Sequence, residues 1–148
     1  MKASRNYPFD SKVLETLFVD PKEISFISPL SGGYFNPKLF EGFYKSFFNE
    51  SWLFYDEALN LIGHAGLVQE DGEKPFLCHL YLVPELRGKG QAQRFVLFLE
   101  QKLIDEGKLQ LWLNVEISNI RAQKFYRKLN YQVIEETKSR ITFRKILL

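Results

Sequence analysis

The fold is decided by the stretch Val83-Pro84-Glu85-Leu86-Arg87-Gly88-Lys89-Gly90-Gln91-Ala92. Just before it, the apolar run at residues 76–83 predicts a largely buried strand. Just after it, apolar residues recur at helical spacing and predict one apolar stripe on a helix: Ala92, Phe95, Val96, Leu99 and Leu103. The sequence therefore predicts a strand, a short glycine-rich loop and the start of a helix.

Such a loop is typical of a phosphate or pyrophosphate site. Successive backbone N–H groups and the positive end of a helix dipole point at one place. Gly88 and Gly90 lack a Cβ, so the backbone can take positive φ and an anion can come close. The spacing fits neither a P-loop nor the dinucleotide fingerprint, whose third glycine is replaced by Gln93. An ordinary tight strand-to-helix turn is the alternative for the loop alone.

A second informative segment covers residues 111–131. Alternating apolar residues at 111, 113 and 115 predict a strand, and Ser118 or Asn119 can cap the helix that follows. One face of that helix carries the apolar and aromatic residues Ala122, Phe125, Tyr126 and Leu129. Asn130 suits a left-handed residue at the helix C-terminus, although glycine is the more usual choice there.

The two segments together carry a family resemblance. Arg-x-x-Gly-x-Ala, at Arg87, Gly90 and Ala92, resembles the acyl-CoA pyrophosphate loop of the GNAT superfamily of N-acetyltransferases. Asn-x-x-Ala-x-x-Phe-Tyr-x-x-Leu-x-Tyr, over residues 119–131, resembles the second signature of that family. The resemblance is close over residues 76–131, and the first half of the chain matches only in the order of its elements.

The resemblance implies an α/β (α+β) fold with a mixed, mostly antiparallel central sheet. Helices cover both faces, and a splayed parallel strand pair lies at the cofactor site. The patterns predict helices at about 10–19, with Asp10 or Ser11 as cap, and at 38–48, with a loop at 31–37 between them. Strands are predicted at 23–28, 51–55, 60–69, 132–136 and 140–146. We expect residues 1–148 to form a single acetyl-CoA-binding domain.

Composition limits the function classes. With 148 residues, of which 45% are hydrophobic, the chain can bury one sizeable core. A net charge of only +2, with both signs interspersed, gives no case for nucleic acid. No apolar run is long enough to span a bilayer, and no signal segment follows the first residues. The single cysteine, Cys78, and two histidines argue against a disulfide and a metal site. A cytoplasmic protein is expected.

The resemblance also implies which residues bind acetyl-CoA. Leu82 and Val83 would bond through their backbone to the pantetheine arm, as if it were another strand. Asn119 would reach that arm from the start of the second helix. The pyrophosphate would be held by the N–H groups of Arg87, Gly88, Lys89, Gly90, Gln91 and Ala92.

Attack of an amine on a thioester needs a deprotonated amine, donors at the oxyanion and an acid for the thiolate. Tyr126 occupies the position of that acid in the family, and a core aromatic is its alternative role. Phe76 and Asn114 stand where family members carry a catalytic glutamate. Asn114 can hold a water that removes the proton, or the acceptor arrives neutral, and Glu116 is the nearest carboxylate in sequence. The two histidines, at 64 and 79, are expected to be structural or on the surface.

The leading hypothesis is acetyl transfer from acetyl-CoA to a primary amine of a small molecule or peptide, by direct attack on the thioester. Tyr126 favours it. The missing carboxylates favour the alternative, an inactive or weakly active acyl-CoA-binding regulator that acts through a protein partner. The acceptor and the oligomeric state, a homodimer included, stay open. The acidic residues Glu41, Glu50, Asp56 and Glu57 either attract a cationic amine or form a solvated surface.

Overall fold

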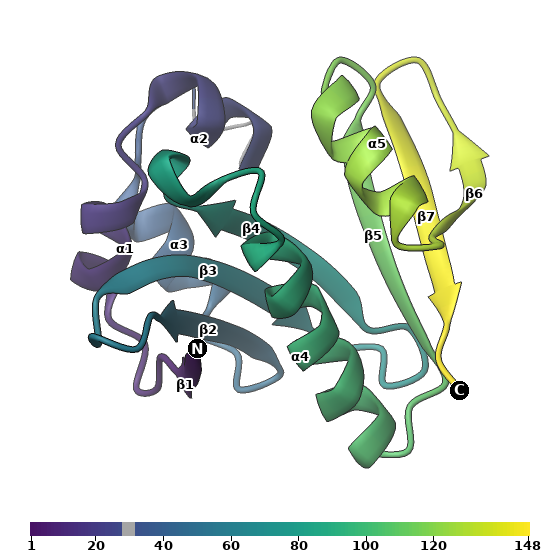
Figure 1. Ribbon diagram of the computed structural model, residues 1–148, viewed down its shortest axis with the longest axis horizontal. Coiled ribbons are helices and arrows are strands. Elements are labelled where there is room, and N and C mark those ends of the chain that lie inside the picture. Colours follow the sequence, from purple (N-terminus) through teal and green to yellow (C-terminus); the bar gives the residue numbers. More distant parts are fainter. Residues whose placement is uncertain (28–31) are drawn as a thin grey trace.

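The computed structural model describes residues 1–27 and 32–148, and in this part of the chain seven strands form one mixed sheet (Figure 1). The strands are β1 (Lys2–Arg5), β2 (Asn49–Tyr55), β3 (Leu61–Val68), β4 (Phe76–Leu82), β5 (Gln110–Glu116), β6 (Gln132–Glu136) and β7 (Arg140–Ile146). Their order in the sheet is β1-β2-β3-β4-β5-β7-β6. Only β4 and β5 pair in parallel, and the other described neighbours are antiparallel. The predicted mostly antiparallel sheet with one parallel pair is therefore confirmed.

Helices cover both faces of the sheet, as predicted. They are α1 (Ser11–Leu17), α2 (Pro21–Ile27), α3 (Pro37–Phe43), α4 (Gln91–Asp105) and α5 (Ile120–Lys128), with a short 3-10 turn, η2 (Pro84–Leu86). One buried cluster lies under α4 and α5 and includes Phe95, Leu99 and Tyr126. A second lies under α1, α2 and α3 and includes Leu14, Ile24, Phe40 and Tyr81. No helix in residues 1–27 or 32–148 has the length and apolarity needed to cross a bilayer.

The first half of the chain departs from the predicted elements. The segment predicted as a first strand, 23–28, forms most of α2 instead, and Ser28 lies outside the described residues. The Asp20 side chain accepts a hydrogen bond from the Lys22 N–H (2.9 Å), and Pro21 takes the first helical position. Both are helix-start signals, and they explain why this segment forms a helix and not the predicted strand. The first strand is β1, which the sequence reading missed.

The predicted helix at 38–48 is shorter than expected. It ends at Phe43, whose carbonyl accepts a hydrogen bond from the Asn49 side chain (2.8 Å). That bond satisfies a carbonyl that helix termination leaves free. Asn49 itself begins β2. The other strands, and the cap of α1 by Asp10, agree with the prediction to within about two residues, as boundaries usually do.

The pairing of β4 with β5 is short. Only Phe76 with Trp112 and Leu77 with Leu113 face each other in register, and the strands diverge after these pairs (Figure 1). The splayed parallel pair implied by the resemblance is therefore present.

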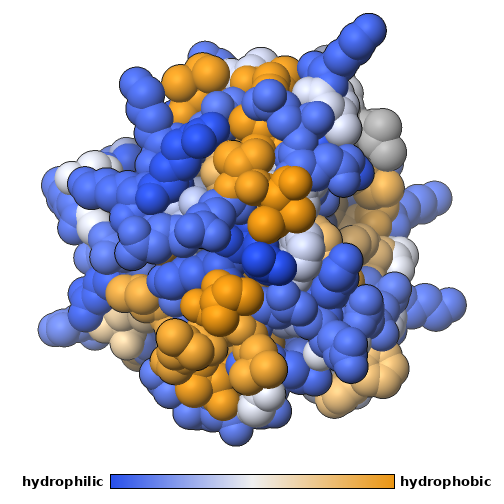
Figure 2. Space-filling model, turned by 90° about the vertical axis from the view of Figure 1, so that its right-hand side faces the viewer, coloured by the Kyte–Doolittle hydropathy of each residue, from blue (hydrophilic) through white to orange (hydrophobic). Residues whose placement is uncertain are grey.

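The face formed by α5, β6 and β7 is mostly hydrophilic, with apolar side chains in separate patches (Figure 2). Among the exposed apolar residues of β6 and β7 are Val133, Ile134 and Ile146.

Gly63 on β3 leaves no room for a side chain. A Cβ at this position would lie 2.6 Å from the Tyr81 carbonyl oxygen and would overlap the Phe95 ring, which stacks on Phe54. We expect Gly63→Ala to lower the free energy of unfolding by about 1–3 kcal/mol through overpacking. Gly42→Ala is the matched control, because a Cβ there meets nothing within 4 Å.

In helix α3, Gly42→Ala should raise stability by up to about 1 kcal/mol through helix propensity. Urea unfolding of the two variants, followed by tryptophan fluorescence, measures both changes. Equal stability of the Gly63→Ala protein and the unmutated protein would contradict the packing described here.

Candidate active site

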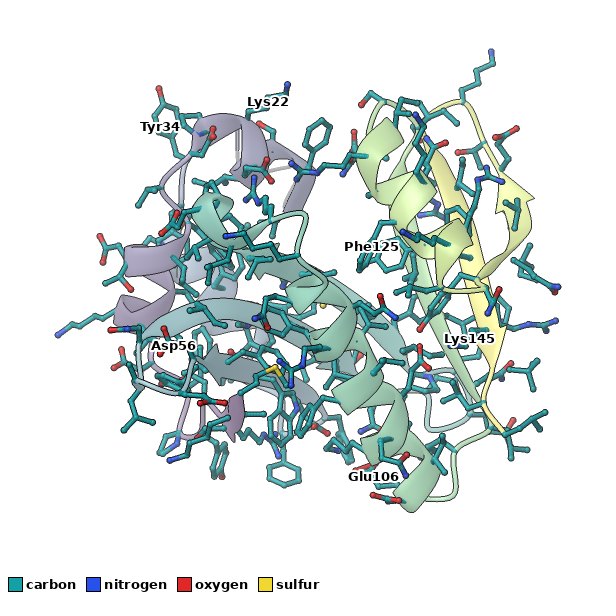
Figure 3. The ribbon with its side chains drawn as sticks, viewed as in Figure 1. Lys22, Tyr34, Asp56, Glu106, Phe125 and Lys145 are labelled. Atoms are coloured by element: carbon teal, nitrogen blue, oxygen red, sulfur yellow. The ribbon has the colours of Figure 1, made fainter. Side chains whose placement is uncertain are left out.

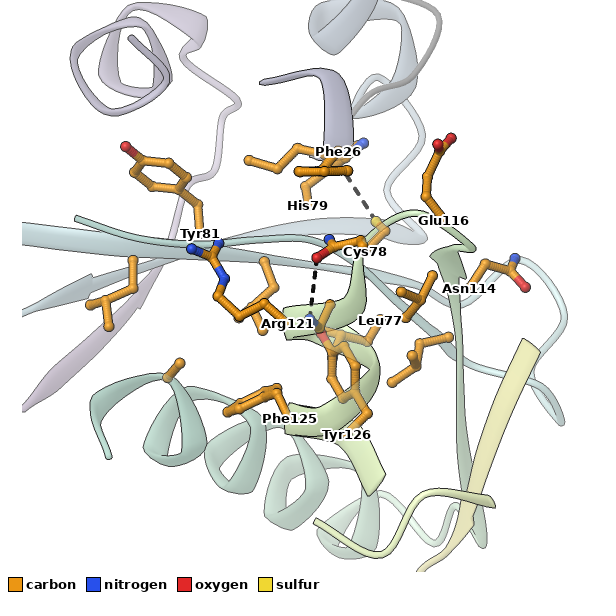
Figure 4. Close-up of a pocket in the computed structure, with 18 of the residues that line it drawn as sticks. Phe26, Leu77, Cys78, His79, Tyr81, Asn114, Glu116, Arg121, Phe125 and Tyr126 are labelled. Atoms are coloured by element: carbon orange, nitrogen blue, oxygen red, sulfur yellow. Dashed lines mark hydrogen bonds between the residues drawn. The ribbon is translucent and has the colours of Figure 1, made fainter. Parts of the chain in front are cut away.

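A cavity of about 1150 Å³ lies where β4 and β5 separate. Its lining comes from both strands, from the glycine loop at 87–90, from the first turn of α4, from α5 and from α2. Phe26 and His79 lie on one side of β4, and Phe125 and Tyr126 lie on the other (Figure 4). Because the strands no longer pair beyond Leu77, the cavity passes between them and joins the two faces of the sheet.

The glycine loop has the backbone that was predicted. Gly88 and Gly90 have φ values of 78° and 81°, in the left-handed region that glycine tolerates best. A Cβ at either position would meet nothing within 4 Å, so the space beside the main chain is open. Among the described residues, no backbone carbonyl accepts from the N–H groups of residues 88–93. The Arg87 N–H donates to the Pro84 carbonyl (3.2 Å), so the free donors begin at Gly88.

These free donors suit an anion. They stand at the N-terminus of α4, whose N-cap Gly90 supplies no side-chain bond. The residues at the loop therefore fit the pyrophosphate of a coenzyme, by free backbone N–H groups and open space.

The Arg87 side chain turns back into the protein. Its Nε donates to the Leu82 carbonyl (2.9 Å), and its Nη1 pairs with Glu23 of α2 (3.1 Å). Glu23 also binds Arg121 at the start of α5 (3.0 Å). One carboxylate thus joins α2, the glycine loop and α5 at the cavity. The sequence reading missed Glu23, because these pairs span 64 and 98 residues and leave no local signal.

The end of β4 distinguishes the two residues predicted to bind the cofactor arm. The Val83 N–H donates to the Ile62 carbonyl (2.9 Å), and the Val83 carbonyl accepts from Leu86 (3.1 Å). The N–H of Val83 is therefore already bonded, whereas its carbonyl oxygen keeps a second lone pair for a backbone bond to the arm. Since Val83 and Ile62 form a hydrogen-bonded antiparallel pair, the adjacent Leu82 and Gly63 form a non-bonded pair. The Leu82 N–H points away from β3, toward the gap.

A bulge in β4 is held by His64. The register with β3 shifts between His64 and Gly66, and His79 has a φ of 48°. The His64 Nδ1 donates to the His79 carbonyl (2.8 Å), and the Ser51 hydroxyl donates to His64 Nε2 (2.8 Å). In a trans peptide the N–H points opposite to the C=O. The Leu80 N–H therefore points away from the His64 ring.

The groups around this bulge are uncharged at neutral pH. Burial lowers the pKa of His64 to about 4, and burial together with the nearby His64 lowers the pKa of His79 to about 3. The Tyr44 hydroxyl is hydrogen bonded to His79 Nδ1 (2.7 Å). Burial raises the pKa of the Cys78 thiol to about 12, which leaves it without thiolate character. His64, with both ring nitrogens bonded, is a structural histidine, as expected.

Tyr126 packs in the core and also lines the cavity. Its ring packs in the core against Phe125 and Tyr131, with centroids 5.0 and 5.6 Å away. Phe125 projects from α5 toward α4 (Figure 3). Tyr126 nevertheless lines the cavity, and no described residue hydrogen bonds to its hydroxyl. Burial first, and then the Cys78 thiol, raise the pKa of Tyr126, so the hydroxyl stays protonated.

Two asparagines and a glutamate complete the lining. Asn114 is exposed on β5, and its Oδ1 accepts a hydrogen bond from the Thr142 hydroxyl (2.6 Å). Asn119 caps α5, its Oδ1 accepting from the Ala122 N–H (3.2 Å), as predicted for one of two candidate caps. Glu116 follows Asn114 on the same strand face and also lines the cavity.

The cavity brings together most of the predicted site residues: Leu82, Arg87, Gly88, Gly90, Gln91, Ala92, Asn114, Asn119 and Tyr126. Val83 and Lys89 are not part of its lining. None of the four acidic residues considered for amine attraction lines it, and Glu50 is buried in an ion pair with Lys102 (3.1 Å). Residues 1–27 and 32–148 contain no group of three or more His, Cys, Asp or Glu placed to hold a metal ion.

Comparison with known proteins gives a family and a fold. The acetyltransferase (GNAT) family matches residues 13–131. Uncharacterized N-acetyltransferases of Mycobacterium bovis and Mycobacterium tuberculosis are 34% identical over 73 residues, which is 49% of this chain and 47% of theirs. The match therefore spans about half the length of these relatives.

Solved structures share the whole fold at low identity. The spermidine N-acetyltransferase of Vibrio cholerae, in complex with CoA and spermine, has a TM-score of 0.77 at 16% identity, covering 99% of this chain and 95% of that one. An aminoglycoside 6'-acetyltransferase of type Ii has a TM-score of 0.73 at 19% identity, covering 100% and 98%. At these identities the likeness shows the fold.

Buried His64 and half-buried His79 predict a loss of stability in acid. Their pKa values of about 4 and about 3 lie below the 6.5 of an unperturbed imidazole. Between the native pKa values and 6.5, the unfolded chain binds more protons than the native protein. The free energy of unfolding therefore rises with pH in this range. The contribution of these neutral imidazoles to the free energy of unfolding is complete above about pH 6.5. As the pH falls below this value, each imidazole lowers the free energy of unfolding by up to about 1.4 kcal/mol per pH unit.

Urea unfolding at several pH values between about 7 and 5 measures this slope. His79→Asn is the informative variant, because Asn tolerates positive φ and its amide can still bond to the Tyr44 hydroxyl. It should lose one of the two titrating groups and reduce the slope by about half. An unchanged slope in this variant would show that His79 is not buried in the neutral form.

Proposed function

The chain belongs to the acetyltransferase (GNAT) family, and from this we propose that it transfers an acetyl group from acetyl-CoA to a primary amine of a small molecule or peptide. The observation that carries the proposal is the continuous cavity from the free N–H groups at residues 88–93 to the gap between β4 and β5. One end of this cavity can hold a pyrophosphate. The part that passes through the sheet can hold a thioester next to an amine.

In this proposal the glycine loop holds the pyrophosphate through the N–H groups of residues 88–92, with Arg87 nearby. The Leu82 N–H bonds to the pantetheine arm, and the amide nitrogen of Asn119 contributes from the start of α5. The Oδ1 of Asn119 is occupied by its capping bond, which leaves the side-chain NH₂ free for the ligand. These contacts orient the thioester without a metal ion.

The chemistry follows from groups at the gap. The amine nitrogen attacks the thioester carbonyl, and the Leu80 N–H, which points away from His64, stabilises the oxyanion. The C–N bond forms, the C–S bond breaks, and the Tyr126 hydroxyl donates its proton to the departing sulfur. The amine nitrogen loses its proton to a water held by Asn114 or to Glu116, both of which line the cavity.

The alternative function is an acyl-CoA-binding regulator without catalysis. It is favoured by the apolar Phe76 and the amide Asn114 at the two positions where family members carry a base. Both functions need the cofactor site, so binding alone does not separate them. Turnover of an amine separates the two functions, and a substitution at Tyr126 tests whether this residue takes part in the reaction.

Acetyl-CoA should raise the melting temperature of the purified protein, because a ligand bound only by the native state adds about 2.7 kcal/mol at a hundred times its Kd. Gly90→Asp should abolish this shift, since it puts a negative charge beside the free N–H groups. Gly107→Asp is the control: Gly107 has a φ of 79°, close to the 81° of Gly90, and lies outside the cavity. Thermal unfolding with and without acetyl-CoA measures the shift.

The Gly107→Asp protein should keep the shift even if its own stability falls. The cofactor proposal is wrong if folded, unmutated protein shows no shift at saturating acetyl-CoA. It is also wrong if the two aspartate variants respond alike.

Tyr126→Phe should lower kcat by roughly ten- to a thousandfold, because the sulfur then leaves without its acid. The Kd for acetyl-CoA should change little, since the hydroxyl acts mainly in the transition state. Steady-state release of CoA and calorimetric binding measure the two quantities. Tyr131→Phe is the control, because the Tyr131 hydroxyl bonds to buried Glu100 (2.8 Å) and lies outside the cavity.

Tyr131→Phe should affect stability and leave kcat close to its original value. An unchanged kcat in Tyr126→Phe would remove Tyr126 from the reaction. Tight binding of acetyl-CoA without turnover of any amine would support the regulatory alternative.

A further inference from the structure

The half of the cavity on the α1–α3 face is apolar and aromatic. Its lining includes the half-buried side chains of Phe26, Ile27, Phe43, Val68 and Phe76. On β4 the side chains alternate, so that Leu77 joins the core under α4 and α5 while Phe76 and Cys78 face the opposite side. This half is therefore separate from the pyrophosphate loop, and it meets the cofactor half at the gap between the strands.

The β4 side chains that line this half of the cavity carry no charge. Cys78 and His79 line it, and Figure 4 shows His79 and Phe26 on the same side of β4 as the Cys78 side chain. His79 is hydrogen bonded to Tyr44 (2.7 Å) and contacts the Phe43 ring, with centroids 5.0 Å apart. A cationic acceptor gains no ion pair from these groups.

The charged residues that line the whole cavity are two carboxylates and four cations: Glu23, Glu116, Arg87, Arg121, Lys128 and Arg140. Glu116 makes no ion pair with a described residue, whereas Glu23 is bound to both Arg87 and Arg121. Arg140 faces Glu116 across the β5–β7 ladder and lines the cavity as well. Glu116 and Arg140 balance each other in charge, so this half has no surplus of negative charge. A polycation would bring further charges into an apolar space, where an unpaired charge is costly.

We infer that the amine acceptor is a monoamine carried on an apolar, aromatic body. This inference rests on the proposed acetyl transfer. Its amine lies toward the gap and Glu116, and its body packs against the three phenylalanines of this half, at positions 26, 43 and 76. The chain would then differ in acceptor from the spermidine and aminoglycoside enzymes that share its fold.

The test compares amines at equal concentration with acetyl-CoA, by release of CoA from the full chain. The panel is 2-phenylethylamine, L-phenylalaninamide as a mimic of a peptide N-terminus, spermidine and kanamycin. We expect kcat/KM for an aromatic monoamine to exceed that for spermidine by roughly ten- to a hundredfold. The first two amines distinguish a free small molecule from a peptide N-terminus as the source of the same chemistry.

A charge introduced into the aromatic wall should reverse the preference. Phe26→Glu gives this half a surplus of negative charge, so the ratio of kcat/KM for 2-phenylethylamine to that for spermidine should fall by about tenfold or more. The KM for acetyl-CoA should not change. Phe48→Glu is the matched control, because Phe48 is 59% exposed and lies outside the cavity. A general loss of stability would lower both activities and leave their ratio unchanged.

The possible outcomes separate the two proposals. Preferred turnover of spermidine or kanamycin by the unmutated protein overturns this inference and leaves acetyl transfer standing. An equal shift of the ratio in Phe26→Glu and Phe48→Glu also overturns it. Acetyl-CoA binding without turnover of any amine overturns the acetyltransferase proposal and this inference with it.

Discussion

The site depends on the early end of pairing between β4 and β5. After Leu77 and Leu113 the two strands share no ladder, so backbone groups of β4 that would normally bond to a neighbour face open space. Buried backbone N–H groups are costly to leave unpaired. A protein keeps such groups where a ligand or water can satisfy them, and here they line a cavity that joins both faces of the sheet.

One buried side chain on β3 holds the bulge in β4 that lies beside the gap. His64 is fully buried and is bonded at both ring nitrogens, to Ser51 and to the His79 carbonyl. The second bond sets the direction of the peptide between His79 and Leu80, and His79 itself has a positive φ. The neutral imidazole is well suited to this task, since one nitrogen donates while the other accepts. The geometry of the gap is thus maintained from β3, outside the cavity lining.

Local sequence signals account for what could be predicted. Glycines at 88 and 90, the Asn119 cap and the left-handed Asn130 each encode a backbone conformation within a few residues, and the structure has all of them. Features that arise from distant contacts could not be read in this way. The bulge at His79 depends on His64, 15 residues away, and Glu23 pairs with arginines in two other elements. Helix α2, with only seven residues, is too short for helical periodicity to exclude a strand.

The two halves of the cavity therefore differ in what sequence similarity can say about them. The cofactor half is built from residues 82–129, inside the segment whose motifs resemble the family. The acceptor half is built largely from α2, α3, the end of β3 and the start of β4, where no motif was found apart from the loop-bearing strand. Membership of the family thus supports a cofactor and a reaction, whereas the choice of amine follows from the side chains of this chain. Because aromatic rings line that half and its carboxylate, Glu116, stands opposite Arg140, a fold shared with polyamine and aminoglycoside enzymes is a poor guide to its acceptor.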